Sequence, residues 1–477
     1  MATSYRETDK EPGNESDDAF EAGRQDEILH AKNSMLHSGG HDATPHEDYD
    51  LIIIGAGPSG LFCAINSIQK DTTNKDASRK DKIQKIMIQK ERKILVLEKK
   101  ETPGHKLLIS GSGHCNITHD GDIQAFFNHF GDHGRFLRPA LLGFTNLDLV
   151  SYFGGKGLGM IREKGGKIFP ETLRARDVLN ILIEECRDKE VRIDCGQEVR
   201  SIAKTENGFR IMCNGHDYFS RMLVIATGGC SYPGTGSTGD GHRFARDLGH
   251  SIVEIGPALT PLIVKDYPFS ELAGISFSDM GISLYRQGKI GKMQGDILFT
   301  HQGLSGPAVL DLSRRVRPGD ILKLSFVPVE ERGTLDEWLL DRARSEGASE
   351  LKTVLADLPH SVPLPPRLIK RILELSGIDR DSTLAHLTRE KRTHLTDNLT
   401  DLPLVVSELA GFNMAMVTRG GVELNEINPK TMESKLVSGL YLVGEVLDID
   451  GDTGGYNLQA TFSMGMLAAR SIKTKLG

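Results

Sequence analysis

The stretch DLIIIGAGPSG, at residues 50–60, places an apolar run directly before a glycine-rich turn. The run at residues 51–54 is typical of a central strand in a parallel sheet that is covered on both faces. Gly55, Gly57 and Gly60 then follow with G-x-G-x-x-G spacing, and a helix is expected to begin at once. In that context the first glycine permits a tight turn, the second leaves room for a pyrophosphate, and the third lets the helix pack against the strand. Because helix N-termini attract phosphates, the stretch predicts dinucleotide binding in a Rossmann-like domain.

A second predicted strand, KILVLE at residues 93–98, ends in Glu98, whose carboxylate suits the hydroxyl groups of a ribose. The distance from Gly60 is 98 − 60 = 38 residues, where about 20 is usual. The excess lies in residues 70–92, a lysine-rich segment that we interpret as a solvated surface insertion. The alternative is a nucleic-acid patch. The segment lacks interleaved aromatic residues and the chain is net acidic, so we expect no nucleic-acid partner.

The bulk composition predicts a protein of several domains that is located in the cytoplasm. The chain has 477 residues and a formal net charge of −7, enough for two or three domains with sizeable cores. Residues 1–48 are acidic and polar, which predicts a disordered tail. There is no run of 18 apolar residues, so we expect no membrane span. The six cysteines form no CxxC pair, which favours reduced thiols and argues against a metal site.

The order of the segments indicates that one domain is inserted into another. From residue 257 the chain becomes β-rich with many Gly and Pro, and residues 330–402 are charged and helical in pattern. A last apolar strand, GLYLVG at residues 439–444, precedes a final helix and completes the sheet that the chain opened at residue 50. The predicted boundaries are 49–256 for the first part of the dinucleotide-binding domain, 257–425 for the insertion, and 426–477 for the C-terminal part.

A second cluster, formed by Gly234, Gly236 and Gly239, has the same G-x-G-x-x-G spacing. It could form a second nucleotide site that holds NAD(P)H beside a flavin. However, residues 229–233 separate it from the preceding strand, and Pro233 directly precedes the first glycine, whereas the motif needs its turn at the end of the strand. We therefore favour the alternative, a polar loop that lines the first site.

Several long motifs together resemble one family. They are KLLISGSGHCNITH at residues 106–119, ATGGCSYPGTGSTGDGH at 226–242, and GLYLVGEVLDIDGDTGGYNLQATFSMG at 439–465, in addition to GAGPSG. With further matches at 299–313 and 417–435, they resemble the BaiN/YhiN-type bacterial flavoproteins over about residues 48–477. The resemblance implies FAD as the resident cofactor. It also implies an α/β fold in which a Rossmann-like FAD-binding domain carries an inserted β-barrel (257–329 and 403–425) and a small helical domain (330–402).

The resemblance also implies which residues contact FAD. By matched position these are Gly55, Gly57, Pro58, Ser59 and Gly60 in the first loop; Glu98 and Lys99 at the ribose; His105, Lys106, Ser110, Gly111 and Asn116 along the ribityl and phosphate path; Val199 at the adenine; Thr227, Gly228 and Gly229; and Gly444, Glu445, Asn457, Leu458 and Gln459 at the flavin end. Family members often carry arginine at the positions of His105 and His114, so the phosphate and substrate contacts stay open.

A flavin accepts or donates a hydride at N5, and such reactions often need an acid beside the substrate. The candidates for that acid are His301, Cys115, His114 and Tyr456. We expect the FTHQGLSGP loop of the insertion to cover the flavin with His301, although a histidine that only orders the loop is the alternative. Cys115 is equally well explained as a buried, unreactive thiol. The missing CxxC pair argues against a disulfide reductase.

Three functions are consistent with these motifs. The first, which the resemblance favours, is an NAD(P)H-driven reductase of an activated C=C bond in a small organic substrate, for example a sterol-like one. The second is an oxidase of a small amine or ketone that passes electrons to oxygen. The third is a non-catalytic, flavin-bearing module that binds RNA or protein. No motif points to a particular oligomeric state.

Overall fold

The computed structural model describes residues 48–68, 92–358 and 364–477. Nearly all of the predicted acidic tail and of the predicted lysine-rich insertion lies outside the described residues. Within the described part of the chain, no helix is both long and apolar enough to cross a membrane.

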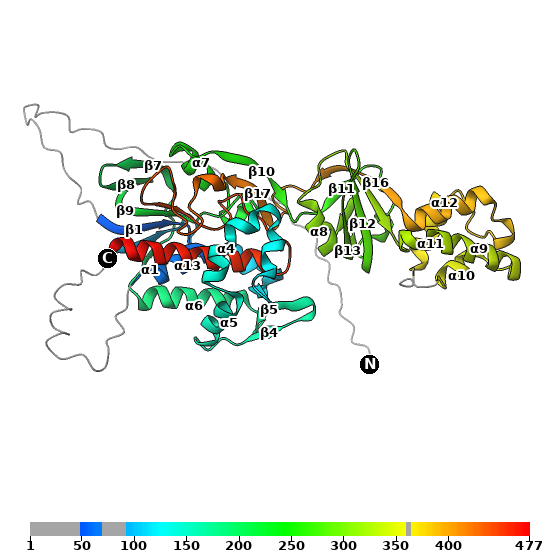
Figure 1. Cartoon of the computed structure of the whole chain (residues 1–477), viewed down its shortest axis with the longest axis horizontal. Helices are drawn as coiled ribbons and strands as arrows, with labels where there is room; N and C mark the ends of the chain where they lie inside the picture. Colours follow the sequence, from blue (N-terminus) through cyan, green and yellow to red (C-terminus); the bar gives the residue numbers. More distant parts are fainter. Residues whose placement is uncertain (1–47, 69–91, 359–363) are drawn as a thin grey trace, which may run out of the picture. The chain divides into compact units, whose positions relative to one another are not determined.

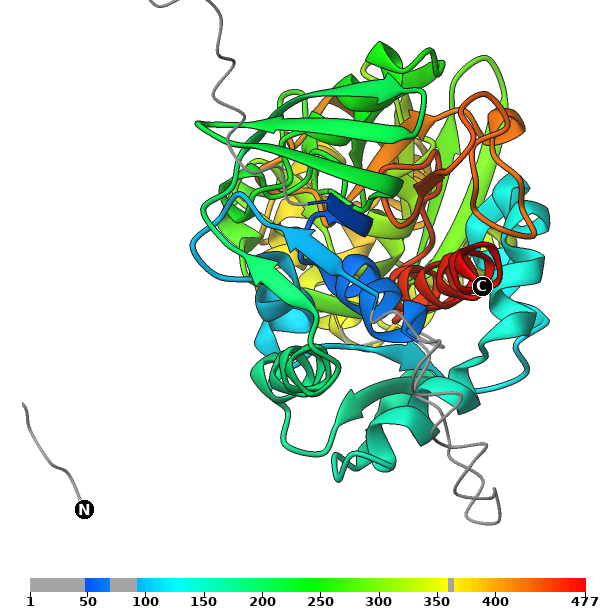
Figure 2. The same cartoon turned by 90° about the vertical axis from the view of Figure 1, so that its left-hand side faces the viewer.

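A seven-stranded sheet forms the centre of the first domain (Figures 1 and 2). Its main strand order is β6-β2-β1-β9-β8-β7, and β18 pairs with the second half of β9. The bounds are β1 Asp48–Ile54, β2 Ile94–Leu97, β6 Arg192–Asp194, β7 Val199–Thr205, β8 Gly208–Cys213, β9 Asp217–Ile225 and β18 Leu440–Leu442. The strands around β1 are parallel and apolar, and all four residues of β2 are buried, as expected for a sheet covered on both faces. The C-terminal strand therefore completes the sheet that the N-terminal strand opens.

Helices cover this sheet, and one of them, α1, begins within the first glycine loop. On one face, α1 and α13 lie side by side (Figures 1 and 2). The helices of this domain are α1 Pro58–Ser67, α3 His105–Ile109, α4 Gly134–Gly143, α5 Asn146–Gly154, α6 Ala175–Asp188, α7 Asp240–Asp247 and α13 Tyr456–Leu476. A small antiparallel sheet lies beside them, with β3 Thr118–His119, β5 Lys167–Pro170 and β4 Met160–Arg162. Pro58 at the first turn of α1 suits a helix start, because its missing N–H would have no helical partner there.

Two strands lead into and out of the inserted domain. They are β10, Ile252–Ala258, and β17, Val417–Val422, and they pair antiparallel with each other. Between them lies a closed barrel of six strands in the order β11-β14-β13-β12-β15-β16. Its bounds are β11 Leu262–Val264, β12 Ser276–Tyr285, β13 Lys289–Phe299, β14 Gly303–Ser305, β15 Ile321–Ser325 and β16 Leu402–Leu409. The last barrel strand ends at Leu409, so the segment 403–425 named from the sequence extends past the barrel into the β10–β17 ladder.

The helical part of the insertion packs at one end of the barrel, where α12 contacts β15 and β16 (Figure 1). Its helices are α9 Arg332–Ser345, α10 Leu351–Ala356, α11 Pro366–Leu375 and α12 Arg389–Thr400; one more helix, α8 Pro307–Ser313, follows β14. The barrel and these helices share one apolar core, which is separate from the core of the sheet domain. The predicted α/β fold with an inserted β-barrel is confirmed.

Candidate functional site

A cavity of about 740 Å³ lies where the carboxyl ends of β1 and β9 meet the inserted domain. Segments far apart in the sequence line it: the first glycine loop, α3, the second glycine loop, the start of α8, the start of β17, and the start of α13. Ligands of open α/β sheets bind in this position, outside the carboxyl ends of the strands. We therefore take this cavity as the candidate active site.

The first glycine loop has the geometry that a pyrophosphate needs. A side chain at Gly60 would place its Cβ atom 2.0 Å from the Gly55 carbonyl oxygen, so only glycine lets α1 pack this close to β1. Gly55 has a φ of +105°, in the region that favours glycine. At Gly57, by contrast, no atom lies within 4 Å of an added Cβ. Open space at the N-terminus of α1 is therefore available to an anion, which the helix amides attract.

The Glu98 carboxylate lies at the end of β2 and lines the same cavity. Its two oxygens accept hydrogen bonds from the backbone amides of Ala56, at 2.9 Å, and Lys100, at 3.0 Å. These two bonds tie the acid to the first glycine loop and fix its orientation. Each carboxylate oxygen retains a lone pair that can accept a ribose hydroxyl.

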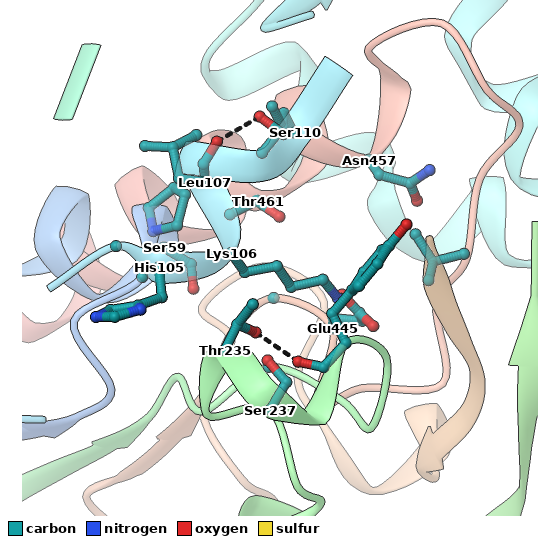
Figure 3. A pocket seen from close by; sticks show the side chains of 18 of the residues that line it. Ser59, His105, Lys106, Leu107, Ser110, Thr235, Ser237, Glu445, Asn457 and Thr461 are labelled. Atoms are coloured by element: carbon teal, nitrogen blue, oxygen red, sulfur yellow. Dashed lines mark hydrogen bonds and ion pairs between the residues drawn. The ribbon is translucent and has the colours of Figure 1, made fainter. Parts of the chain in front are cut away.

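An ion pair joins two of the predicted FAD residues across the cavity. The Lys106 ammonium of α3 lies 2.6 Å from a Glu445 carboxylate oxygen, and the two side chains extend toward each other (Figure 3). The other Glu445 oxygen accepts hydrogen bonds from the Ser231 hydroxyl, at 2.8 Å, and the Thr418 amide, at 2.9 Å. Lys106 also donates to Ser231. This network joins four segments that are distant in the sequence. It is only partly exposed, and each of its members has a partner within it.

The second glycine loop lines the first cavity through Tyr232, Thr235, Gly236 and Ser237, as the favoured interpretation predicted (Figure 3). The helix that follows it, α7, begins with Asp240, whose carboxylate lies 2.6 Å from the Lys99 ammonium. Burial opposes ionisation of Asp240, but the hydrogen bond and charge of Lys99 outweigh it, and the pKa of the acid is lowered. A carboxylate thus already lies at this helix N-terminus, where a second dinucleotide would place its phosphates.

The inserted domain contributes an apolar wall to the cavity. This apolar wall consists of Leu259, Pro307, Leu310, Met416 and Val417. Three of them are buried in one small cluster at the junction of the two domains. Met416 is 45% exposed, so it lies at the mouth of the cavity.

Hydrogen bonds and ion pairs hold α8 against the loop that precedes α13. The Asp311 carboxylate accepts from the Thr453 amide at 2.7 Å and from the Thr453 hydroxyl at 3.2 Å. Arg314 forms ion pairs with both Asp450 and Asp452. Burial raises the pKa of Asp311 to about 6, although the Thr453 amide opposes the shift. Since Thr453 and Asp452 line the cavity, these contacts fix the position of the apolar wall relative to the FAD-binding domain.

The structure brings nearly all of the predicted FAD residues to this one cavity. The exceptions are Gly60, Gly229 and Gln459. Gly60 serves the packing of α1, as described above. A side chain at Gly229 would place its Cβ 2.3 Å from the Thr418 hydroxyl, so this glycine lets Thr418 and Glu445 meet. The contacts of the other residues with FAD stay predictions.

Gln459 is a correction to the predicted set, because its side chain is buried and bonded within the protein. Its amide oxygen accepts from the Thr118 hydroxyl at 2.7 Å, and its amide nitrogen donates to the Phe144 carbonyl and the Ser463 hydroxyl. The helical period turns this position of α13 toward the core, whereas Asn457 and Leu458 line the cavity.

His301 does not lie at the cavity, so the expected cover over the flavin is not formed by its loop. The residue is exposed and lies in the connection between β13 and β14. Pro307 and Leu310 of α8 take that place instead. Gly306, with a φ of +93°, turns the chain into α8, where any side chain would contact the backbone of β13 within 2.7 Å.

The other candidate acids also lie outside the lining of the cavity. Cys115 is fully buried, and burial raises the pKa of its thiol to about 12, so the sulfur stays protonated. Tyr456 is stacked between the rings of His119 and His129, with centroids 5.0 and 3.8 Å away, and burial raises its pKa to about 12. His114 is exposed. None of these described residues therefore lies where it could act on a ligand in the cavity.

Sequence reasoning missed several lining residues, among them Tyr232, the apolar wall and Thr453. The loop that carries Tyr232 was predicted to line the first site, but no local signal singled out this residue. The residues of the apolar wall carry no periodic signal, because they come from the ends of three elements that only the insertion brings together.

Comparison with known proteins identifies the family. A model of the "HI0933-like protein Rossmann domain" matches residues 49–471. The chain is 32% identical to a "Ribosomal RNA dihydrouridine synthase" of Escherichia coli (strain K12), over 89% of this chain and 98% of the relative. It is 30% identical to a "3-dehydro-bile acid delta(4,6)-reductase" of Clostridium scindens, over 88% of this chain and 98% of the relative.

The chain belongs to the HI0933-like Rossmann-domain family. It is an FAD-dependent oxidoreductase, as the motifs predicted. Among solved structures, a 3-ketosteroid-delta4-(5alpha)-dehydrogenase from Rhodococcus jostii RHA1 is similar over 91% of this chain and 98% of that chain. The TM-score is 0.46 at 13% identity.

The residues of the cavity fit FAD. The open N-terminus of α1 at Gly57 suits the pyrophosphate, the oriented Glu98 suits the adenosine ribose, and Glu445 with the start of α13 would hold the flavin end. When bound, FAD supplies a centre that accepts and donates a hydride.

Proposed function

We propose that this protein is an NAD(P)H-driven reductase of a C=C bond conjugated to a carbonyl group, in a cyclic and mostly apolar small molecule. The observation that carries the proposal is the apolar wall. Five apolar residues from the inserted domain line the same cavity as the FAD residues. Ligand sites of this kind combine an apolar lining with a few polar groups that set orientation.

Two relatives support the type of reaction. One is named for reduction at delta(4,6) of a 3-dehydro-bile acid, and the other for synthesis of dihydrouridine. Both names describe saturation of a ring C=C bond next to a carbonyl group. The protein's part in such a reaction is to bind and orient the acceptor and to stabilise charge on the carbonyl oxygen.

A uridine in RNA is the second candidate acceptor, because the relative at 32% identity is named for ribosomal RNA. Against it, the formal net charge of the chain is −7. Of the three lysines that line the cavity, Lys99, Lys106 and Lys167, the first two are moreover already paired with carboxylates. Nucleic-acid sites usually present basic groups that are free to meet phosphates. We therefore keep a small-molecule acceptor, and no nucleic-acid partner, as the proposal.

The test is anaerobic mixing of the purified holoprotein with NADH or NADPH, followed by addition of an acceptor. Rapid bleaching of the flavin absorbance, then recovery with 4-androstene-3,17-dione, is the result we expect. Bleaching only by an amine or a saturated ketone would indicate the oxidase alternative. Recovery only with uridine-containing RNA would indicate the second candidate, and no bleaching by any donor would indicate a binding module.

A further inference from the structure

Tyr232 has a backbone conformation that tyrosine rarely adopts. Its φ is +51°, in the left-handed region, and Pro233 follows it. A bulky residue there costs on the order of 1–3 kcal/mol and persists only when its surroundings hold it. Such strain gathers at ligand sites, so its presence here calls for a functional explanation.

Three hydrogen bonds hold the backbone of Tyr232. Its amide donates to the Phe412 carbonyl at 2.8 Å. Its carbonyl accepts from the Thr235 amide at 2.8 Å and from the Thr235 hydroxyl at 2.7 Å (Figure 3). Phe412 belongs to the segment by which the chain returns from the barrel, after β16. The position of Tyr232 is thus set jointly by the second glycine loop and the inserted domain.

The side chain of Tyr232 lines the cavity between its polar and apolar parts. Ser231, its neighbour, belongs to the Lys106–Glu445 network, and Met416, four residues after Phe412, belongs to the apolar wall. Within the described residues, no hydrogen bond is recorded for the phenol oxygen, whereas the side chains of Lys99, Lys106 and His105 each have at least one. Tyr232 is thus a half-buried residue of the cavity lining whose phenol O–H is available to a ligand.

We propose that Tyr232 is the residue that binds the carbonyl oxygen of the acceptor and stabilises its negative charge during reduction; this rests on the proposed function. The reaction balances as one hydride and one proton. Bound FAD, reduced by NAD(P)H, would supply the hydride, which adds to the β-carbon of the conjugated C=C bond. The electron pair of that bond moves toward the carbonyl oxygen, where the phenol O–H donates a hydrogen bond. Water then supplies the proton to the α-carbon.

A hydrogen-bond donor aimed at a developing oxyanion contributes roughly 10²-fold to a rate. A phenol suits this role because it is uncharged and rigid, and because it donates a hydrogen bond without needing a counter-ion. The three hydrogen bonds of its main chain fix the position of the Tyr232 backbone before the acceptor arrives.

The test uses Tyr232→Phe, which keeps the ring and the backbone and removes only the hydroxyl. In the FAD-loaded protein, bleaching by NADPH should match the wild type, because that step involves no acceptor carbonyl. Reoxidation by 4-androstene-3,17-dione or 2-cyclohexen-1-one should slow roughly 10²-fold. Binding of either ketone to the oxidised protein, read as a shift in the flavin spectrum, should weaken about tenfold, as expected for one hydrogen bond of about 1.4 kcal/mol.

The matched control is Tyr285→Phe, in β12 of the barrel and outside the lining of the cavity. It should behave as the wild type in all three measurements. Equal reoxidation and ketone binding in Tyr232→Phe and the wild type would overturn the role of Tyr232 and leave the proposed function standing. Loss of FAD from Tyr232→Phe would also overturn it, by showing that the phenol serves the cofactor. Failure of the wild type to bind or reduce either ketone would overturn both proposals together.

Discussion

The two glycine loops of this protein share one spacing but differ in their backbone context, and the difference decides which of them leaves room for a phosphate. The first follows β1 directly and opens α1, and at Gly57 it leaves space in which no atom lies within 4 Å. In the second, Gly236 has a φ of +106°, and an added Cβ would lie 3.1 Å from the Lys100 side chain. Its helix begins with a paired carboxylate. Equal spacing therefore identifies a phosphate site only where the turn and the helix start also leave room for the anion.

The most direct test of this comparison is to place a bulky side chain in the open space of each loop. Gly57→Val should abolish FAD binding, because its side chain would occupy the place of the pyrophosphate. The matched control is Gly234→Val, since no atom lies within 4 Å of an added Cβ there either. It should retain the flavin, with a melting temperature within about 2 °C of the wild type. Flavin absorbance after gel filtration measures both, and FAD loss from Gly234→Val would contradict the assignment of the two loops.

The sequence predicted the first loop well because every requirement was local. An apolar run, three glycines and a helix start lie within about twenty residues, and each has a fixed steric reason. The acid Glu98 could be found in the same way, since it ends the next apolar strand despite the long gap. The composition indicated only a β-rich and then a helical segment, and the resemblance to the family implied the barrel and the small helical part.

The substrate side of the cavity could not be predicted in the same detail, because the direction of its turns and side chains depends on contacts between distant segments. His301 was a reasonable candidate by position, but the turn at Gly306 directs α8 rather than that loop to the cavity. Gln459 follows two lining residues, yet the helical period turns it into the core. The left-handed backbone of Tyr232 depends on hydrogen bonds to residues from other segments, which no local pattern records.

A smaller effect on ketone binding should distinguish the apolar wall from the exposed residues near it. Met416→Lys places a charge at the mouth of the cavity. An apolar ligand would have to bury or displace this charged side chain, which costs free energy. We therefore expect the variant to retain FAD and to bind 4-androstene-3,17-dione about tenfold more weakly. The control is Met414→Lys, which is 56% exposed and lies outside the lining. It should bind the ketone as the wild type does. Titration of the flavin spectrum with the ketone measures both, and equal affinities would remove Met416 from the substrate site.

The smallest expected effect concerns the contact between α8 and Thr453. The pKa of Asp311 is raised to about 6 in the folded protein, so the folded state binds its proton more tightly than the unfolded state does. This contribution to the free energy of unfolding is present below about pH 4 and is lost as the pH rises through about 6.

Asp311→Asn removes that titration. The difference in unfolding free energy between wild type and variant should therefore change by roughly 1 kcal/mol between pH 4 and pH 7, with the wild type losing relative stability as the pH rises. Urea unfolding at several pH values measures it. Asp357→Asn, at an exposed position after α10, should show no such change. A pH-independent difference for Asp311→Asn would mean that this carboxyl titrates normally.

The central claim is that one cavity holds one dinucleotide, FAD, and that the second glycine loop lines this cavity without holding a dinucleotide of its own. Release of the cofactor by denaturing the purified protein, followed by chromatography and quantification, tests this most directly. The account predicts FAD at one molecule per chain and no tightly bound nicotinamide dinucleotide. Finding FMN, or a second dinucleotide bound at equal stoichiometry, would contradict it.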